Sequence, residues 1–232
     1  MKKLVLIICL SLMIIVLIAE EHLPSKEEII EKYIIALGGR AKIEKLETRT
    51  CSGFLVKDVS WEIPPYDVVP FIAMAKTPNK FLIKYAEDGA ERRSGFDGEN
   101  GWKQIANEII PDKHIGRPKL SWIFNPQHIL HIDKFFTNLK FSGIQFIYEK
   151  QAYVLQPQNL PKEYYSLYFD VETGLLLGIG YHWRILDYKE VDGVLTPCRI
   201  IEGRKGGSYT YLIKEFQHNK LINDSFFLKP KK

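Results

Sequence analysis

Tight-turn residues divide most of this sequence into short runs in which apolar and polar side chains alternate. Asp97-Gly98, Asn100-Gly101 and Asp192-Gly193 each lie between two such runs, as does Glu172-Thr173-Gly174. Residues that tolerate a positive φ close tight hairpins, so the runs on either side are expected to pair as antiparallel strands. The pattern predicts mainly β structure, with strands at 50–56, 71–76, 80–86, 92–96, 101–106, 141–149, 152–156, 164–170, 175–189, 194–202 and 208–216.

Two longer segments carry a helical pattern instead. Ser25 followed by Glu28 forms a capping box, and the helical apolar spacing that begins there ends at Gly38, with a short basic turn of helix after it. Asn125 and Pro126 predict a further helix that runs to about residue 140. The predicted fold class is therefore mainly β (α+β), an antiparallel sheet with two or three helices.

The N-terminus carries the pattern of a secretory signal. Lys2 and Lys3 precede an uncharged apolar run at 4–19, which Glu20 follows at once. The run is short for a membrane span, and Ala19 is a small residue at a suitable cleavage point. We predict a signal peptide over residues 1–19, with an uncleaved N-terminal anchor as the alternative. In both cases residues 20–232 are expected to form a single exported domain, in the periplasm or elsewhere outside the cytoplasm. That domain is either released by cleavage or anchored to the membrane by residues 4–19.

Charge and composition exclude several protein classes. Hydrophobic residues make up 46% of the chain and charged residues 26%, which is typical of a globular protein and not of a disordered or fibrous one. The formal net charge of +4 falls to +2 when Lys2 and Lys3 are removed with the signal segment. Basic residues are interspersed with acidic ones, so no nucleic-acid partner is predicted.

The sequence contains no recognisable catalytic motif. It has no phosphate-binding glycine loop, nucleophile elbow or zinc-protease helix, so we predict no catalytic residue and no cofactor. His128 and His131 are three apart on a predicted helix and could hold a metal, but no third ligand stands near them, so a structural role is favoured. Asp97, Asp170 and Asp192 stand at hairpin turns, where hydrogen bonds to the backbone explain an aspartate.

Cys51 and Cys198 are the two cysteines that follow the signal segment. An exported protein can keep a disulfide, but a bridge requires the two strands to be neighbours. The sequence leaves the pairing open, and two buried free thiols are the favoured interpretation.

Several predicted strands have one fully apolar face. In the strand predicted at 175–189, every second residue from 175 to 185 is apolar, and the strand at 80–86 alternates in the same way. One interpretation is a closed core, and the other is a curved sheet whose concave face is partly closed by helices and holds an apolar ligand. The candidate lining, which includes two residues from the side of the predicted lid, is Phe81, Ile83, Tyr85, Trp102, Trp122, Phe124, Leu177, Ile179, Tyr181 and Trp183.

An ordered set of segments carries a family resemblance. The segments are EIIEKYIIALGGRAKIEKL at 28–46, TRTCSG at 48–53, AKTPNK at 75–80, GFDGENGW at 95–102, QAYVL at 151–155, YFDVETGLL at 168–176 and YKEVDGVLTP at 188–197. Together they resemble the outer-membrane lipoprotein-sorting (LolA-like) superfamily, in an uncharacterised exported branch. The resemblance implies a LolA/LolB-like half-open barrel with helices over an apolar cavity that receives acyl chains, without cofactor or catalysis. The segment at 111–126 departs from the family pattern.

Pattern and resemblance together predict an exported, non-catalytic carrier or binder of lipid or lipoprotein acyl chains, with outer-membrane lipoprotein sorting as one such role. The expected partners are those acyl chains and a membrane-associated protein that takes delivery of them, and the expected state is a monomer. The alternative is an envelope sensor or scaffold with the same fold and no transfer role. A hydrolase of unrecognised type is the third interpretation.

Overall fold

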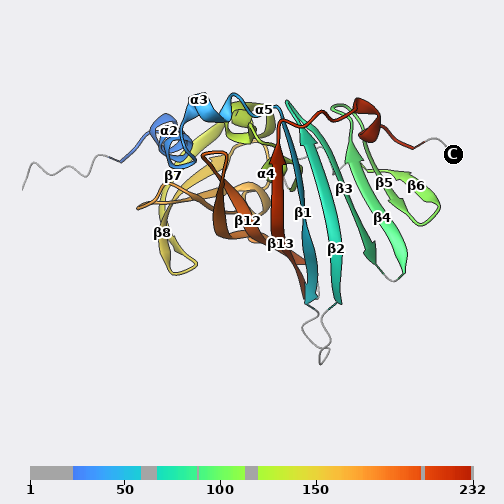
Figure 1. The fold of residues 1–232 in the computed structure, drawn as a ribbon. Coiled ribbons are helices and arrows are strands. Elements are labelled where there is room, and N and C mark those ends of the chain that lie inside the picture. The colour runs from blue at the N-terminus through green and yellow to red at the C-terminus, as the bar shows by residue number, and fades with distance from the viewer. Residues whose placement is uncertain (1–22, 59–66, 88, 113–119, 205–206, 231–232) are drawn as a thin grey trace, which may run out of the picture.

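A computed structural model of the protein describes residues 23–58, 67–87, 89–112, 120–204 and 207–230 (Figure 1). The predicted signal segment lies outside the described residues. The described strands form one 13-stranded sheet in which all neighbours are antiparallel. The strands are β1 Thr48–Asp58, β2 Asp67–Lys76, β3 Lys80–Glu87, β4 Ala90–Phe96, β5 Gly101–Ile105, β6 Glu108–Pro111, β7 Leu139–Ile147, β8 Lys150–Pro157, β9 Leu167–Asp170, β10 Leu176–Ile179, β11 Trp183–Val191, β12 Val194–Arg204 and β13 Gly207–His218.

The strand order shows how the chain builds this sheet. It runs β6-β5-β4-β3-β2-β1-β13-β12-β11-β10-β9-β8-β7, so the first six strands form one meander and the last seven another. The two meanders meet where β1 pairs with β13, with Arg49 opposite His218. The sheet is curved and unclosed, and β6 and β7 form its edges. The predicted mainly β, antiparallel, half-open architecture is confirmed.

The helices α2 (Lys26–Ala36), α3 (Arg40–Ile43) and α5 (Ile132–Phe135) lie together along one end of the strands, whereas η2 (Asp224–Phe226) lies apart from them near the C-terminus (Figure 1). The predicted capping box is present in the first helix: the Glu28 backbone N–H donates to Ser25 Oγ at 3.2 Å, and the Ser25 N–H donates to Glu28 Oε2 at 2.7 Å. The helical elements are α2 Lys26–Ala36, α3 Arg40–Ile43, α4 Leu120–Phe124, η1 His128–His131, α5 Ile132–Phe135, α6 Lys162–Tyr165 and η2 Asp224–Phe226.

The predicted continuous helix from Asn125 to about residue 140 is wrong. The structure has the short turns η1 and α5 there, and β7 begins at Leu139. The N-cap of η1 is Gln127 and not Asn125, whose Oδ1 accepts a hydrogen bond from the Gln127 N–H at 2.9 Å in the preceding turn and whose side-chain amide donates to the Pro78 carbonyl. The backbone leaves the helical region at Phe136, with φ −124° and ψ 86°, and Asn138 adopts a φ of 54° just before β7 begins.

The predicted strand at 175–189 is two strands. The chain turns at Gly180, whose φ is 54°, and a side chain there would lie 2.5 Å from the Tyr164 backbone. The backbone N–H of Tyr181 bonds to the Glu163 carbonyl instead of to a neighbouring strand. The alternation predicted through 175–185 therefore breaks at this turn, and α6 replaces the start of the strand predicted at 164–170.

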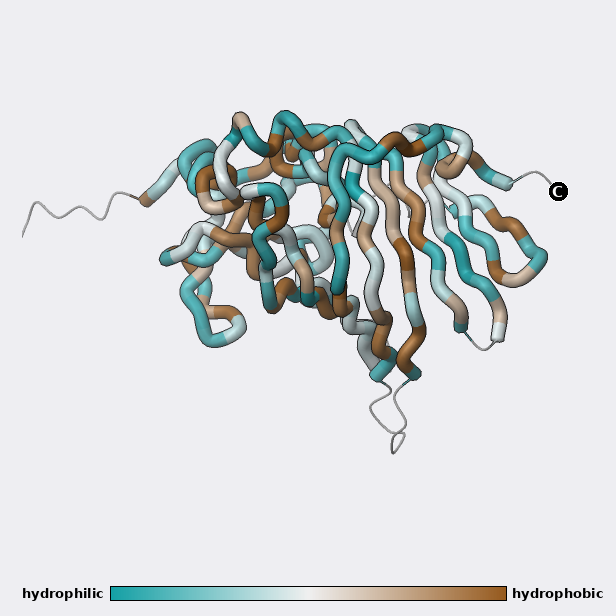
Figure 2. The backbone as a smooth tube through the Cα atoms, viewed as in Figure 1, coloured by the Kyte–Doolittle hydropathy of each residue, from teal (hydrophilic) through white to brown (hydrophobic). Residues whose placement is uncertain are grey.

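The apolar residues of the sheet form clusters on both of its faces. We call concave the face that packs against the helices, marked by Leu55, Phe71, Phe81 and Ile179 of the largest buried cluster. The opposite, convex face has two smaller clusters, one around Leu82 and Trp102 and one around Val154 and Leu177. Figure 2 shows hydrophobic and hydrophilic residues interspersed along the strands, as a sheet with two distinct faces requires.

Candidate functional site

An apolar surface covers the concave face of β1 to β4 together with β13. The strand register places Leu55 between Val69 on β2 and Tyr211 on β13. It likewise places Phe71 opposite Tyr85. Because residues paired across antiparallel strands share a face, these side chains form one continuous surface.

The short helix α4 covers the end of this surface nearest the other helices. The Phe124 ring lies 5.9 Å from the Phe81 ring and 6.5 Å from the Phe71 ring, centroid to centroid. Trp122 packs edge-on against Phe136 at 5.1 Å, and its indole N–H donates to the His128 carbonyl at 3.0 Å. Phe124 therefore packs α4 against the sheet at Phe81 and Phe71, and Trp122 packs it against the helical turns that follow.

The structure brings together seven of the ten candidate lining residues and separates three. Trp102 is on the convex face, because its register partner is Gly95, and its indole N–H donates to the Phe227 carbonyl at 2.8 Å. Leu177 belongs to a convex cluster, and Tyr181 lies in the β10–β11 turn with 68% of its surface exposed. The residues that belong to or pack against the concave cluster are Phe81, Ile83, Tyr85, Trp122, Phe124, Ile179 and Trp183.

Burial varies along the concave face. Ile179 is fully buried and Phe81 is 3% exposed, whereas Tyr85, Phe96 and Val69 are only half-buried. Val69, Phe96 and Tyr211 also pack in or against this cluster, although the lining predicted from the sequence does not include them. The alternation of Tyr209, Tyr211 and Ile213 in the sequence is the signal that could have identified the β13 residues of this surface.

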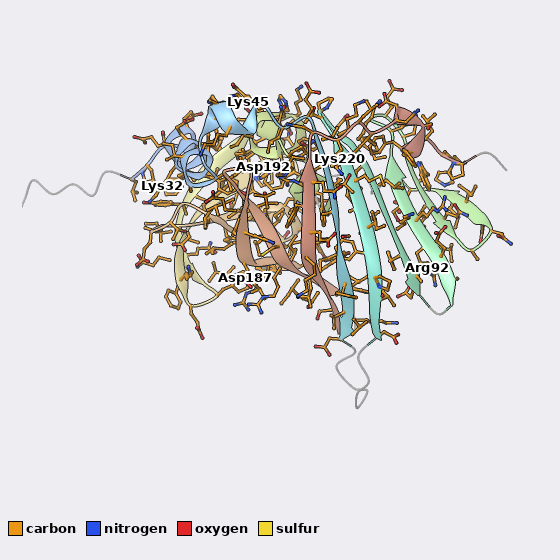
Figure 3. All side chains as sticks on the ribbon, viewed as in Figure 1. Lys32, Lys45, Arg92, Asp187, Asp192 and Lys220 are labelled. Carbon is orange, nitrogen blue, oxygen red and sulfur yellow. The ribbon has the colours of Figure 1, made fainter. Side chains whose placement is uncertain are left out.

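A polar cluster lies on the same face, near the strand ends away from the helices. Glu87 accepts a hydrogen bond from the Tyr209 hydroxyl at 2.8 Å. Its carboxylate is also 3.3 Å from Arg92 Nε and 3.8 Å from Lys57 Nζ. Figure 3 places Arg92 on β4 toward the end of the strand that is far from the helices. The apolar surface therefore ends in a half-buried set of charges.

A buried arginine ties the sheet to α4. Arg49 is 3% exposed, and burial lowers the pKa of its guanidinium to about 10. Its N–H groups donate to the Phe124 carbonyl at 3.5 Å, to Thr196 Oγ1 at 3.3 Å and to His218 Nε2 at 3.1 Å. Since Nε2 of His218 accepts, its Nδ1–H donates to Asp192 Oδ2, 2.9 Å away.

His128 makes structural hydrogen bonds with both ring nitrogens. Nδ1 lies 3.0 Å from the Asn125 carbonyl, which can only accept, so Nε2 accepts from the Tyr33 hydroxyl at 3.0 Å. Burial, followed by the charge of Arg49, lowers the pKa of His128 to about 3. Among the described residues, no group of three or more His, Cys, Asp or Glu side chains is placed to hold a metal ion.

The turn aspartates have the roles that the sequence favoured, and the cysteines have them in part. Cys51 and Cys198 are both free, but only Cys51 is buried, whereas Cys198 is half-buried. Burial raises the pKa of the Cys51 thiol to about 12. Asp97 Oδ1 accepts from the backbone N–H groups of the two residues at 99 and 100, at 2.8 and 2.7 Å. Asp170 Oδ1 accepts from the Glu172 N–H at 2.9 Å, and Asp192 adopts a φ of 53° in its hairpin. These carboxylates shape turns.

Comparison with known proteins gives matches in structure and none in sequence. No protein-family model and no curated protein matches the chain. A LolA superfamily protein from Nitrosomonas europaea has a TM-score of 0.57 and 12% identity, over 89% of this chain and 99% of that one. A putative outer membrane lipoprotein-sorting protein domain from Vibrio parahaemolyticus has a TM-score of 0.55 and 9% identity, over 85% of this chain and 95% of that one.

Two further observations bear on the class of protein. None of the helices in the described residues combines the length and the apolar character that a membrane crossing requires. The similar structures are matched over almost their whole length, at identities that identify the fold alone. The chain therefore has the fold of the LolA superfamily.

Proposed function

We propose that the protein is an exported, non-catalytic binder of the acyl chains of lipids or lipoproteins, and that the concave face of β1 to β4 and β13 is the binding surface. The observation that supports this proposal most is the change in burial across that face. Val69, Tyr85 and Phe96 are half-buried, and they pack against a cluster of fully buried aromatic and aliphatic side chains. The apolar run at 4–19 supports export, as does the similarity of fold to a lipoprotein-sorting protein domain.

Acyl chains suit this surface for a physical reason. Each methylene that leaves water for an apolar surface contributes about 0.8 kcal/mol, so several methylenes offset the cost of association. Flat aromatic side chains such as Tyr85 and Phe96 contact a chain without demanding a particular chain length or head group. The surface therefore favours a class of ligand and not a single compound.

The polar cluster at the open end supports the same assignment. Lys57 and Arg92 place two positive charges beside the Glu87 carboxylate, which also accepts the hydrogen bond of the Tyr209 hydroxyl. A polar or anionic head group can remain in water beside these side chains while the chain lies on the apolar surface. We place the head group at this end.

A direct test starts with the protein as purified without detergent. Native mass spectrometry with lipid extraction should detect acyl-chain species bound to the protein. A protein that is empty, and that also fails to bind a fluorescent fatty acid, contradicts the proposal and favours the sensor or scaffold.

Two adjacent valines on β2 provide a matched test of the face. Val69 lies on the concave face and packs against the buried cluster, whereas Val68 points the other way and is 55% exposed. Val69→Glu should weaken fatty-acid binding at the concave site at least tenfold, and Val68→Glu should leave binding at that site unchanged. Circular dichroism checks that both variants fold. Equal affinities of the two variants would show that the concave face is not the site.

A further inference from the structure

The C-terminal segment forms a second layer on the convex face. It follows β13 and crosses the strands β2 to β5 (Figure 1). Phe227 is fully buried and Ile222 is 6% exposed, both against Leu82 and Trp102 of the sheet. The hydrogen bond from the Trp102 indole to the Phe227 carbonyl fixes this contact. The segment is thus docked on the sheet.

Ion pairs of Asp224 with lysines of β2 and β3 also hold the C-terminal segment on the sheet. Asp224 Oδ1 lies 2.7 Å from Lys76 Nζ, and Oδ2 lies 2.6 Å from Lys80 Nζ. Hydrogen bonds from these two lysines lower the pKa of Asp224 to about 2. One carboxylate therefore faces two ammonium groups, and the convex face keeps an excess of positive charge here.

Between the docked segment and the sheet is a groove of about 420 Å³. This volume is within the range of small-molecule sites, about 300–1,000 Å³. Its sheet side is apolar at Met74, Leu82 and Trp102, and its other side is formed by the end of the segment from Ser225 to Pro230. The groove opens to solvent on the face opposite to the proposed acyl-chain surface.

Positive charge gathers at this groove. Lys84 and Arg93 both line it and stand directly opposite each other in the β3–β4 pair. Like charges in that arrangement repel and destabilise the pair. Arg93 Nε has one carboxylate oxygen at 2.5 Å, from Glu91, whereas Lys84 has no acidic partner among the described residues. Lys229 adds a third cation to the lining.

We propose that this convex groove binds an anionic amphiphile with a single acyl chain. The acid head group lies between Lys84 and Arg93, where it relieves their mutual repulsion, and the chain lies along Met74, Leu82 and Trp102. The observations that carry the site are the groove, its apolar sheet side and the opposed cations. It does not depend on the function proposed for the concave face.

The test compares two probes that differ in the sign of the head group. Laurate and dodecyltrimethylammonium carry similar alkyl chains, and each is titrated calorimetrically below its micelle concentration. The protein used for these titrations carries Val69→Glu, which should weaken the concave site at least tenfold and so leave the convex groove as the stronger site. Laurate should bind this variant at one site, at least tenfold more tightly than the cationic probe. Equal affinities for the two probes would overturn the proposal.

A charge reversal locates the site. Adding Lys84→Glu should weaken laurate binding at least tenfold, and it places a carboxylate opposite Arg93, so the fold should tolerate it. Adding Lys214→Glu, at an exposed position on β13, should leave binding unchanged. If both variants bind laurate equally, the groove is not the site, whatever the result for the valine pair.

The alternative partner of the groove is a membrane surface. Vesicle binding distinguishes a membrane contact from the binding of single amphiphile molecules. Sedimentation with phosphatidylglycerol vesicles should show no Lys84-dependent binding if the site takes single amphiphiles. Binding to vesicles without laurate binding would overturn the proposal in favour of a membrane contact.

A brominated fatty acid adds a positional readout, since its quenching of tryptophan fluorescence should fall in a Trp102→Phe variant.

Discussion

The two ends of the sheet bury their apolar side chains to different extents. On β8 to β10, Leu155, Phe169 and Ile179 have no exposed surface, because the helical layer covers the concave face there. On β3 and β4, Tyr85 and Phe96 of the same face are half-buried. On the convex side of the β3–β4 end, the C-terminal segment covers Leu82 and Trp102. One antiparallel sheet thus provides a sealed core at one end and an accessible apolar surface at the other.

The difference follows from how much helix the chain has. In the described residues, α2 with 11 residues is the longest helix, and the others have three to five. A 13-stranded sheet offers more apolar area than these elements can cover. The uncovered part is where we place the acyl chain, so stability and binding should respond to different residues.

The largest expected effect is in the sealed core. Phe169 is fully buried and its ring lies 5.3 Å from the Tyr33 ring. Phe169→Ala should reduce the free energy of unfolding by about 3–5 kcal/mol, because it leaves a cavity. Phe96→Ala on the half-buried surface should cost about 1 kcal/mol. Urea unfolding measures both, and equal losses would remove the distinction between the two ends.

A pH titration tests whether the helical layer excludes water. His128 has a pKa of about 3 in the folded protein and about 6.5 when unfolded. The unfolded chain therefore binds a proton that the folded protein does not, and stability should fall as the pH drops from 6.5 toward 3, by up to about 1.4 kcal/mol per pH unit. His128→Gln should make this dependence shallower than His131→Gln does. Identical slopes would mean that water reaches His128.

The packing of the C-terminal segment on the convex face can be disturbed by a substitution at one glycine. A Cβ at Gly95 would lie 2.5 Å from the Trp102 ring, so Gly95→Ala should displace the tryptophan and cost about 1–3 kcal/mol. It should also speed proteolysis of the C-terminal segment. Gly203→Ala is the control, since the nearest atom to a Cβ there is 3.6 Å away. Unchanged proteolysis would show that Trp102 does not hold the segment.

The smallest expected effect concerns the ion pairs of Asp224. Its folded pKa of about 2 is below the value of about 3.9 for an unfolded aspartate. The ion pairs should therefore stabilise the protein above about pH 4 and lose this effect as the pH falls through 2. Asp224→Asn should be less stable than the natural protein at pH 6 and equally stable near pH 1.5. A difference that persists at pH 1.5 would have another cause.

Local chemistry made much of the fold predictable. Asp97 bonds to the backbone two and three residues on, and Gly174 and Asp192 adopt a positive φ. Each of these turns depends on residues a few positions apart, so the hairpins could be predicted from the sequence. The helix predicted from Asn125 failed for the opposite reason: the Asn125 amide bonds to Pro78, 47 residues away.

The candidate site was predictable in part. Alternation showed that Phe81, Ile83 and Tyr85 share a face, and their strand bears that out. It could not place Trp102 relative to them, because alternation separates the two faces of one strand without saying which face of the next strand continues the same surface. The pairing of Gly95 with Trp102 and the covering Phe227 decided that placement.

The sequence by itself determined the antiparallel hairpins, the first helix and the apolar faces, since each depends on neighbours along the chain. Only the tertiary structure decided that β1 pairs with β13, that the helices cover one end of the sheet, and that the C-terminal segment covers the convex side of the other. Arg49 and His218 are 169 residues apart and meet across one strand pair. Contacts of that range depend on how whole layers pack, and the local pattern of side chains does not encode them.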